Sequence, residues 1–272
     1  MGGTGETMRN PLPLTTHAVR NSARGLIVWS AGIAGTLFLY LPLFPSLGGA
    51  SELQSIIDTL PPELIAALGY DQITTGAGYT QSTFFGLIGF ALMVIAATSW
   101  GSALLAGAWE SGDLGLELAH SVSRTRVVLE AALTLLIRIS VLLAVAGTVI
   151  LALNGPAELD LEPQNVAAAL VALGGLALLS GAGALLAGAL SGRRSIATGV
   201  GASLAVLGFA FQAVARQSND LEWLGNLSPF HWAYDPLPLQ EGFAQPGLPL
   251  LWGVGTVCVG LTVLVLNRRD IT

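Results

Sequence analysis

Six long apolar runs, separated by shorter polar segments, constrain this chain more than any other feature. They cover residues 26–45, 83–108, 127–153, 165–191, 195–214 and 248–266. A helix needs about 20 residues to cross the hydrocarbon core of a membrane, and every run is long enough. Only 10% of the 272 residues are charged, against about 25% in soluble domains. The sequence therefore predicts an all-α membrane protein with six transmembrane helices, not a large soluble helical core.

The positions of the arginines predict how the chain is oriented. All eleven cationic side chains are arginines, and nine lie before the first run, between the second and third, between the fourth and fifth, or after the sixth: Arg9, Arg20, Arg24, Arg124, Arg126, Arg193, Arg194, Arg268 and Arg269. The remaining connections are rich in Asp and Glu and contain a single cation, Arg216. Positive charge collects on the cytoplasmic side of membrane proteins. We therefore expect both termini, and the loops after the second and fourth spans, to be cytoplasmic in a plasma (inner) membrane.

The connections are too short to hold a second folded core, so residues 1–272 are predicted to form a single membrane domain. Residues 1–25 are a cytoplasmic lead-in, either disordered or carrying a short interfacial helix. Apolar spacing of three and four over 46–82 predicts amphipathic helices on the outer surface, broken at Pro61–Pro62. The proline-rich, aromatic stretch 215–247 predicts an outer hairpin-like segment that dips to the membrane interface.

Small residues recur every fourth position in the fourth run, at Ser180, Ala184, Gly188 and Gly192. Such a stripe lets a neighbouring helix approach closely. Packing within one protomer explains the stripe more simply than a contact between two protomers.

No motif for catalysis or for cofactor binding is present. The chain has no lysine, which excludes a P-loop, and it has neither a G-x-S-x-G elbow nor an H-E-x-x-H motif. His17, His120 and His231 lie in separate connections without metal-ligand spacing. The net charge of −6 does not favour nucleic-acid binding. The prediction is a protein that is not an enzyme and has no cofactor or metal of its own.

The connection 109–126 combines acids with leucines in one short cytoplasmic loop. Leu114, Leu116 and Leu118 provide an apolar surface beside Glu110 and Glu117. The loop ends at Ser123, a residue type preferred at the N-cap of a helix. Composition alone explains this loop equally well as a docking surface or as a solvated turn.

The same stretch resembles the loop after the second span in permease subunits of type-2 ABC exporters. That loop has an acid followed by G-T-L-E-L-L-L-x-x-P-V-S-R. The matching positions are Glu110, Gly112, Leu114, Leu116, Leu118, Val122, Ser123 and Arg124. Gly115 stands where the family has Glu, and Ser121 stands where it has Pro. A second stretch, 228–237, is similar to the S-P-F…D-P-L segment that these permeases carry before their last span.

With the six-span pattern, this resemblance covers nearly the whole chain. It implies a half-size exporter in which two permease chains form the substrate pathway. Two separate ATPase subunits bind ATP and Mg²⁺, and a short helix in the loop docks into each ATPase. The implied coupling residues are Glu110, Gly112, Leu114, Leu116, Glu117, Leu118, Ser123 and Arg124.

The resemblance also suggests where the substrate passes, because the second and fifth spans of the family line the cleft between protomers. Carried over span by span, the candidates are Phe84, Phe85, Leu92, Trp100, Phe209 and Gln212. Arg138 lies near mid-membrane, where a cation normally faces the bundle interior. It is either a substrate contact or a structural tie, and the structural role is favoured. Two alternatives stay open: an ion-coupled secondary transporter and a non-transporting membrane scaffold.

Overall fold

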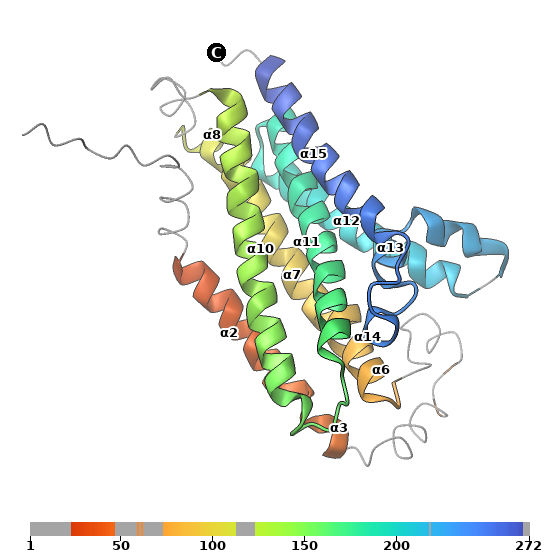
Figure 1. Ribbon diagram of the computed structural model, residues 1–272. Coiled ribbons are helices and arrows are strands. Elements are labelled where there is room, and N and C mark those ends of the chain that lie inside the picture. Colours follow the sequence, from red (N-terminus) through yellow and green to blue (C-terminus); the bar gives the residue numbers. More distant parts are fainter. Residues whose placement is uncertain are drawn as a thin grey trace, which may run out of the picture.

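The computed structural model describes residues 23–46, 59, 61, 73–112, 123–217 and 219–268. Throughout these residues every regular element is a helix, and six helices are long and apolar enough to cross a membrane. They lie side by side in a single bundle (Figure 1). The predicted all-α membrane fold with six transmembrane helices is confirmed.

Five of the six spans begin and end within three residues of their predicted limits. The first span consists of α2 (Ala23–Tyr40) and α3 (Leu43–Ser46). The third is α10 (Arg124–Asn154), the fourth α11 (Pro163–Ser191), the fifth α12 (Arg194–Ala215) and the sixth α15 (Leu248–Arg268). Apolar run length therefore locates these helices well.

The second span is longer than predicted and contains two π-helical segments. It runs through α6 (Gly76–Thr80), η2 (Gln81–Ile88), α7 (Gly89–Ser102), η3 (Ala103–Gly107) and α8 (Ala108–Glu110), with η2 and η3 in π-helical geometry. Residues 76–82 were predicted to belong to the outer connection, and that was wrong. Thr75 caps the helix by accepting a 3.0 Å hydrogen bond from the N–H of Gly78.

Tertiary contacts stabilise this polar first turn. The Tyr79 hydroxyl donates to the Tyr40 carbonyl at 2.9 Å, and the Tyr79 ring packs against Phe44 with 5.2 Å between ring centroids. Hydropathy alone could not place the start, because these contacts come from the first span.

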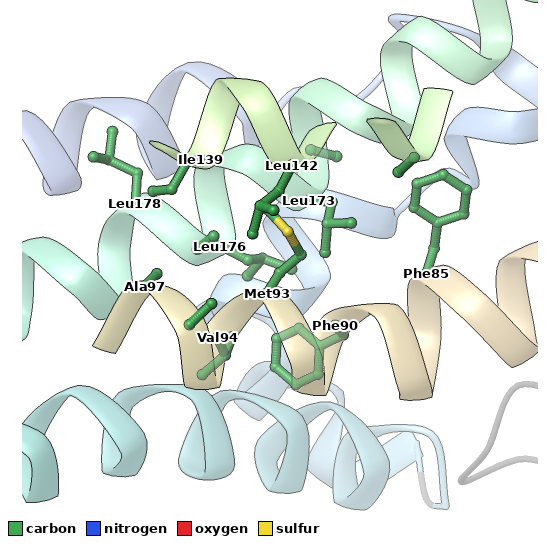
Figure 2. Close-up of a cluster of buried hydrophobic side chains, with 14 of the residues drawn as sticks. Phe85, Phe90, Met93, Val94, Ala97, Ile139, Leu142, Leu173, Leu176 and Leu178 are labelled. Carbon is green, nitrogen blue, oxygen red and sulfur yellow. The ribbon is translucent and has the colours of Figure 1, made fainter. Parts of the chain in front are cut away.

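Helix α11 is the centre of the bundle and contacts α7, α10, α12 and α15. In its most apolar stretch 83% of the residues are buried, against 17% in α2 and in α15. Figure 2 shows part of the resulting core, in which Met93 of α7 points toward Leu142 of α10 and Leu173 of α11. All three side chains are at most 1% exposed.

Small residues let the neighbouring helices approach α11 closely. A Cβ added to Gly101 of α7 would collide with the Gly181 carbonyl of α11. One added to Gly201 of α12 would lie 2.7 Å from the Ser180 carbonyl oxygen. One added to Gly188 would lie 3.1 Å from the Cβ of Ala106. The small-residue stripe therefore packs within one protomer, as predicted.

The connection between α12 and α15 contains three short helices: η4 (Asn219–Leu227, 3₁₀), α13 (Pro229–Tyr234) and α14 (Pro238–Glu241). Ser228 caps α13, and its hydroxyl donates to the Gly208 carbonyl of α12 at 2.6 Å. The ring of Phe230 then packs edge-to-face against Phe90 of α7 and Phe209 of α12, with centroid distances of 5.2 and 5.5 Å. Helix α13 is thus anchored in the bundle by an aromatic cluster.

Three predicted features lie outside the described residues. They are the interfacial helix in the lead-in, the amphipathic helices over most of 47–72, and residues 113–122 of the loop after the second span. These stay predictions.

We expect Gly101→Ala to lower the midpoint of thermal unfolding of the purified protein, because its methyl group would meet the Gly181 carbonyl and force α7 away from α11. The matched control is Gly260→Ala on the exposed side of α15, where nothing lies within 4 Å of the new Cβ. Removing a helical glycine there favours the helix by about 1 kcal/mol. Equal midpoints for the two variants in detergent would contradict the close-packing account.

Candidate functional site

The starts of α10 and α12 and the end of α15 carry arginines and lie at one end of the bundle, near the end of α8 (Figure 1). Only Gly192 and Arg193 separate the end of α11 from the start of α12. Gly192 adopts a left-handed conformation with φ of 68° and donates to the Gly188 carbonyl at 2.8 Å. This tight turn places Arg193 and Arg194 beside the loop that follows the second span. We call this region the arginine end.

Glu110 links the second span to the fifth at the arginine end. Its carboxylate Oε1 accepts a hydrogen bond from the backbone N–H of Arg194 at 2.8 Å. The first N–H groups of a helix have no partner within the helix and attract negative charge. Glu110 therefore caps α12 although it belongs to a different span.

Arg124 makes the corresponding link between the third span and the sixth. Its guanidinium donates to the carbonyls of Leu266 and Asn267, both at 3.2 Å. The Asn267 side chain in turn donates to the Thr125 hydroxyl at 3.1 Å. Ser123 is the N-cap of α10, as predicted, with its hydroxyl accepting from the N–H of Arg126 at 3.3 Å.

The predicted coupling residues are thus divided. Gly112 follows α8 with φ of 83°, a conformation that favours glycine. It lies close in sequence to Glu110, while Ser123 and Arg124 stand at the start of α10. Leu114, Leu116, Glu117 and Leu118 lie outside the described residues. The described part of the loop after the second span therefore ends in two helix-capping junctions.

Two buried charged side chains lie in α10. Glu130 is 3% exposed and pairs with Arg126 one turn earlier, at 2.8 Å between Oε1 and Nε. Arg138 is 4% exposed, and its guanidinium carbon lies 5.5 Å from the centroid of the Trp100 ring of α7. A cation over an indole face is favourable, more so away from water. Arg138 therefore faces the interior of the bundle and ties α10 to α7.

The other predicted pathway residues fall in two environments. Phe84 and Phe85 are 2% and 0% exposed and pack edge-to-face inside the protomer. Leu92 and Phe209 are partly exposed, and the ring of Phe209 supports Phe230. Trp100 lies beside Arg138, whereas Phe209 belongs to the aromatic cluster around Phe230.

Gln212 leads to a pocket that sequence analysis did not identify. The pocket lies between the end of α12, η4 and α13, and its volume is about 710 Å³. In the sequence, the acidic residues that line this pocket indicated only on which side of the membrane their connection lies. Nothing in their spacing predicted that the 3₁₀ turn would bring them over Gln212.

Comparison with protein families decides the class of protein. Residues 8–266 match the family model described as "Multidrug efflux system permease Rv1217c, C-terminal domain". The chain belongs to this family. No curated protein matches the chain. Family membership and the six apolar helices make the chain a multi-pass membrane permease, a transport protein and not a passive scaffold.

We expect Arg138 and Trp100 to be energetically coupled in this permease. Trp100→Leu should lower the free energy of unfolding more in the wild-type background than in the Arg138→Met background, by about 0.5–2 kcal/mol. The reason is that only the wild type has a cation–π contact to lose. The measurement is a double-mutant cycle on reversible unfolding in mixed detergent micelles. Trp100→Phe, which keeps an aromatic face, serves as the control and should show a smaller effect. If the effects of Trp100→Leu and Arg138→Met on the free energy of unfolding were additive, the two side chains would not be coupled and this prediction would be wrong.

Proposed function

We propose that this permease forms the membrane pathway of an ATP-driven ABC exporter, as a dimer with a second identical or homologous chain. The observation that carries the proposal is the efflux-permease family match over residues 8–266, in a chain without a lysine for a P-loop. ATP and Mg²⁺ would then bind separate ATPase subunits. The family name, a multidrug efflux permease, supports export of more than one drug, and the proposed direction is outward across the plasma (inner) membrane.

The two junctions at the arginine end give a physical route for coupling. Residues 113–122 connect Gly112 to Ser123 in the chain. An ATPase subunit that moves this loop would pull on Glu110, which caps the fifth span, and on Arg124, which holds the end of the sixth. One docking loop would thus act on four spans. The resemblance of 110–124 to the coupling loop of type-2 ABC exporters supports this role.

The distribution of ionisable groups favours this mechanism over ion-coupled secondary transport. Ion-coupled transporters carry ionisable side chains near the membrane midplane. In the described spans the deeply buried charges are Glu130 and Arg138, and contacts with Arg126 and Trp100 account for both.

The proposal requires the arginine end to be cytoplasmic. Single cysteines introduced at the exposed positions Ser111 and Ser195 should react with an impermeant thiol reagent only after the cells are permeabilised. A cysteine at the exposed position Asn226, in η4, should react in intact cells. Cys258 is first replaced by Ala to remove the native thiol. Labelling of position 111 in intact cells would reverse the orientation.

Substitutions in the loop should separate ATPase docking from folding. We expect Glu117→Arg and Leu116→Asp to reduce the amount of ATPase that co-purifies and to impair transport, with the permease still inserted. Loss of one member of a buried charge pair costs about 2–5 kcal/mol, enough to lose a subunit during purification.

Glu110 needs its own comparison because it caps α12. Glu110→Arg should weaken both ATPase retention and thermal stability, whereas Glu110→Gln keeps an acceptor for the Arg194 N–H and should preserve stability. Glu241→Arg, in α14 at the other end of the bundle, is the control for a charge reversal. Normal ATPase retention together with normal transport in the Glu110→Arg, Glu117→Arg and Leu116→Asp variants would exclude a coupling role for the loop.

A further inference from the structure

The second span is not a continuous α-helix near the arginine end, because η3 interrupts it between α7 and α8. The N–H of Ala108 donates to the carbonyls of Leu105 and Ala103, and Ala103 is five residues earlier in the chain. An α-helical hydrogen bond reaches back only four residues, so this turn contains one extra residue. Single π-helical turns inside α-helices are rare and are frequently found at functional sites.

On the α7 side of η3, the second span is held by α10 and α11. The Trp100 ring lies 5.5 Å from the guanidinium carbon of Arg138 in α10. Gly101 packs so closely against α11 that an added Cβ would collide with the Gly181 carbonyl. Any rotation of α7 would break both contacts, so the register of α7 is fixed by its neighbours.

On the α8 side, the second span is attached to the start of α12. Glu110 accepts the 2.8 Å hydrogen bond from the Arg194 N–H, and a Cβ on Gly107 would lie 3.8 Å from the Arg194 Cδ. The contact with α11 at this level consists of small residues, since a Cβ on Gly188 would lie 3.1 Å from that of Ala106. Such a contact has no long side chains that must pass each other when one helix slides.

The other π-helical segment of the second span, η2, is built differently. Phe84 and Phe85 of η2 are at most 2% exposed, and a Cβ on Gly89 would lie 2.7 Å from the Phe84 ring. These rings hold η2 in place. Three of the five residues of η3 are Ala or Gly, so η3 is the segment that can change its register at low cost.

A change of one residue at η3 is large enough to control the cap on α12. If η3 became α-helical, α8 would rotate by about 100° relative to α7 and advance by about 1.5 Å. For a Cα atom about 2.3 Å from the helix axis, these two movements together amount to about 4 Å. The 2.8 Å hydrogen bond between Glu110 and the Arg194 N–H would not survive such a displacement.

We propose that η3 is a register joint. At this joint the second span alternates between a π-helical and an α-helical turn, so that α8 releases and restores the cap on the fifth span while α7 stays in place. The inference rests on the proposed function for its driving force, which is the movement of the ATPase against the arginine end. Register shifts of helices take microseconds to milliseconds, which is fast enough for a transport cycle.

Deletion of Ala103 tests the joint, because it removes the extra residue and leaves the register on both sides unchanged. Hydrogen exchange of the purified full-length permease in detergent is followed by mass spectrometry. We expect the amides of residues 104–108 to exchange about tenfold or more slowly in the deletion variant than in the wild type, since the turn can no longer open by changing register. The midpoint of thermal unfolding should not fall.

Deletion of Ala96 is the matched control. Ala96 is buried in the α-helical part of the same span. Its loss rotates Trp100 and Gly101 away from their partners and should lower the unfolding midpoint or prevent folding. Equal exchange of residues 104–108 in the wild type and in the Ala103 deletion variant would overturn the proposal. Failure of that variant to fold would overturn it as well, because an α-helical turn would then be inaccessible at η3.

A second measurement tests the driving force. In the permease purified together with its ATPase, the ATP analogue AMPPNP should accelerate exchange of residues 104–108 in the wild type but not in the Ala103 deletion variant. Unchanged exchange in the wild-type complex would exclude η3 from the coupling route. If no ATPase co-purifies with the wild type, the proposed function fails, whereas exchange in the isolated permease still decides whether the joint exists.

Discussion

The fold depends on how closely other helices can approach α11. Its glycines and alanines bring the backbone of α7 to Gly181 and that of α12 to Ser180, so contact is made over backbone surface and not through long side chains. In lipid the hydrophobic effect gives little advantage to one helix pairing over another, and van der Waals packing of small residues decides which helices associate. Four spans therefore gather around α11, while α2 and α15 keep most of their surface for lipid or for a partner chain.

Several polar contacts satisfy helix ends or buried charges that this packing leaves. Glu110 and Arg124 cap helices that begin or end far away in the sequence, and each joins two spans at the arginine end. Arg138 is held over Trp100 within the packed region. In the proposed exporter, a bundle joined in this way would transmit a displacement of the loop after the second span to several other spans.

The opposite end of the molecule is built on a different principle. Phe230 anchors α13 between α7 and α12, and η4 packs directly against α12. The acids of η4 are then presented beside the buried oxygen of Gln212. Aromatic packing therefore secures this connection, whereas helix-capping contacts join the spans at the arginine end.

The sequence by itself determined the number of spans, their approximate limits, the N-cap at Ser123 and the internal packing of the small-residue stripe. These follow from local properties, because run length, residue size and capping preference are all features of a single helix and its ends. Contacts between distant segments decided the rest. The start of the second span at Gly76 depends on Tyr40 and Phe44, and the cap that Glu110 places on α12 joins residues 84 positions apart. The pocket around Gln212 forms where η4 and α13 meet the end of α12. Phe230 of α13 inserts between α7 and α12, and no periodicity in the sequence encodes where a ring from one connection will insert between two other helices.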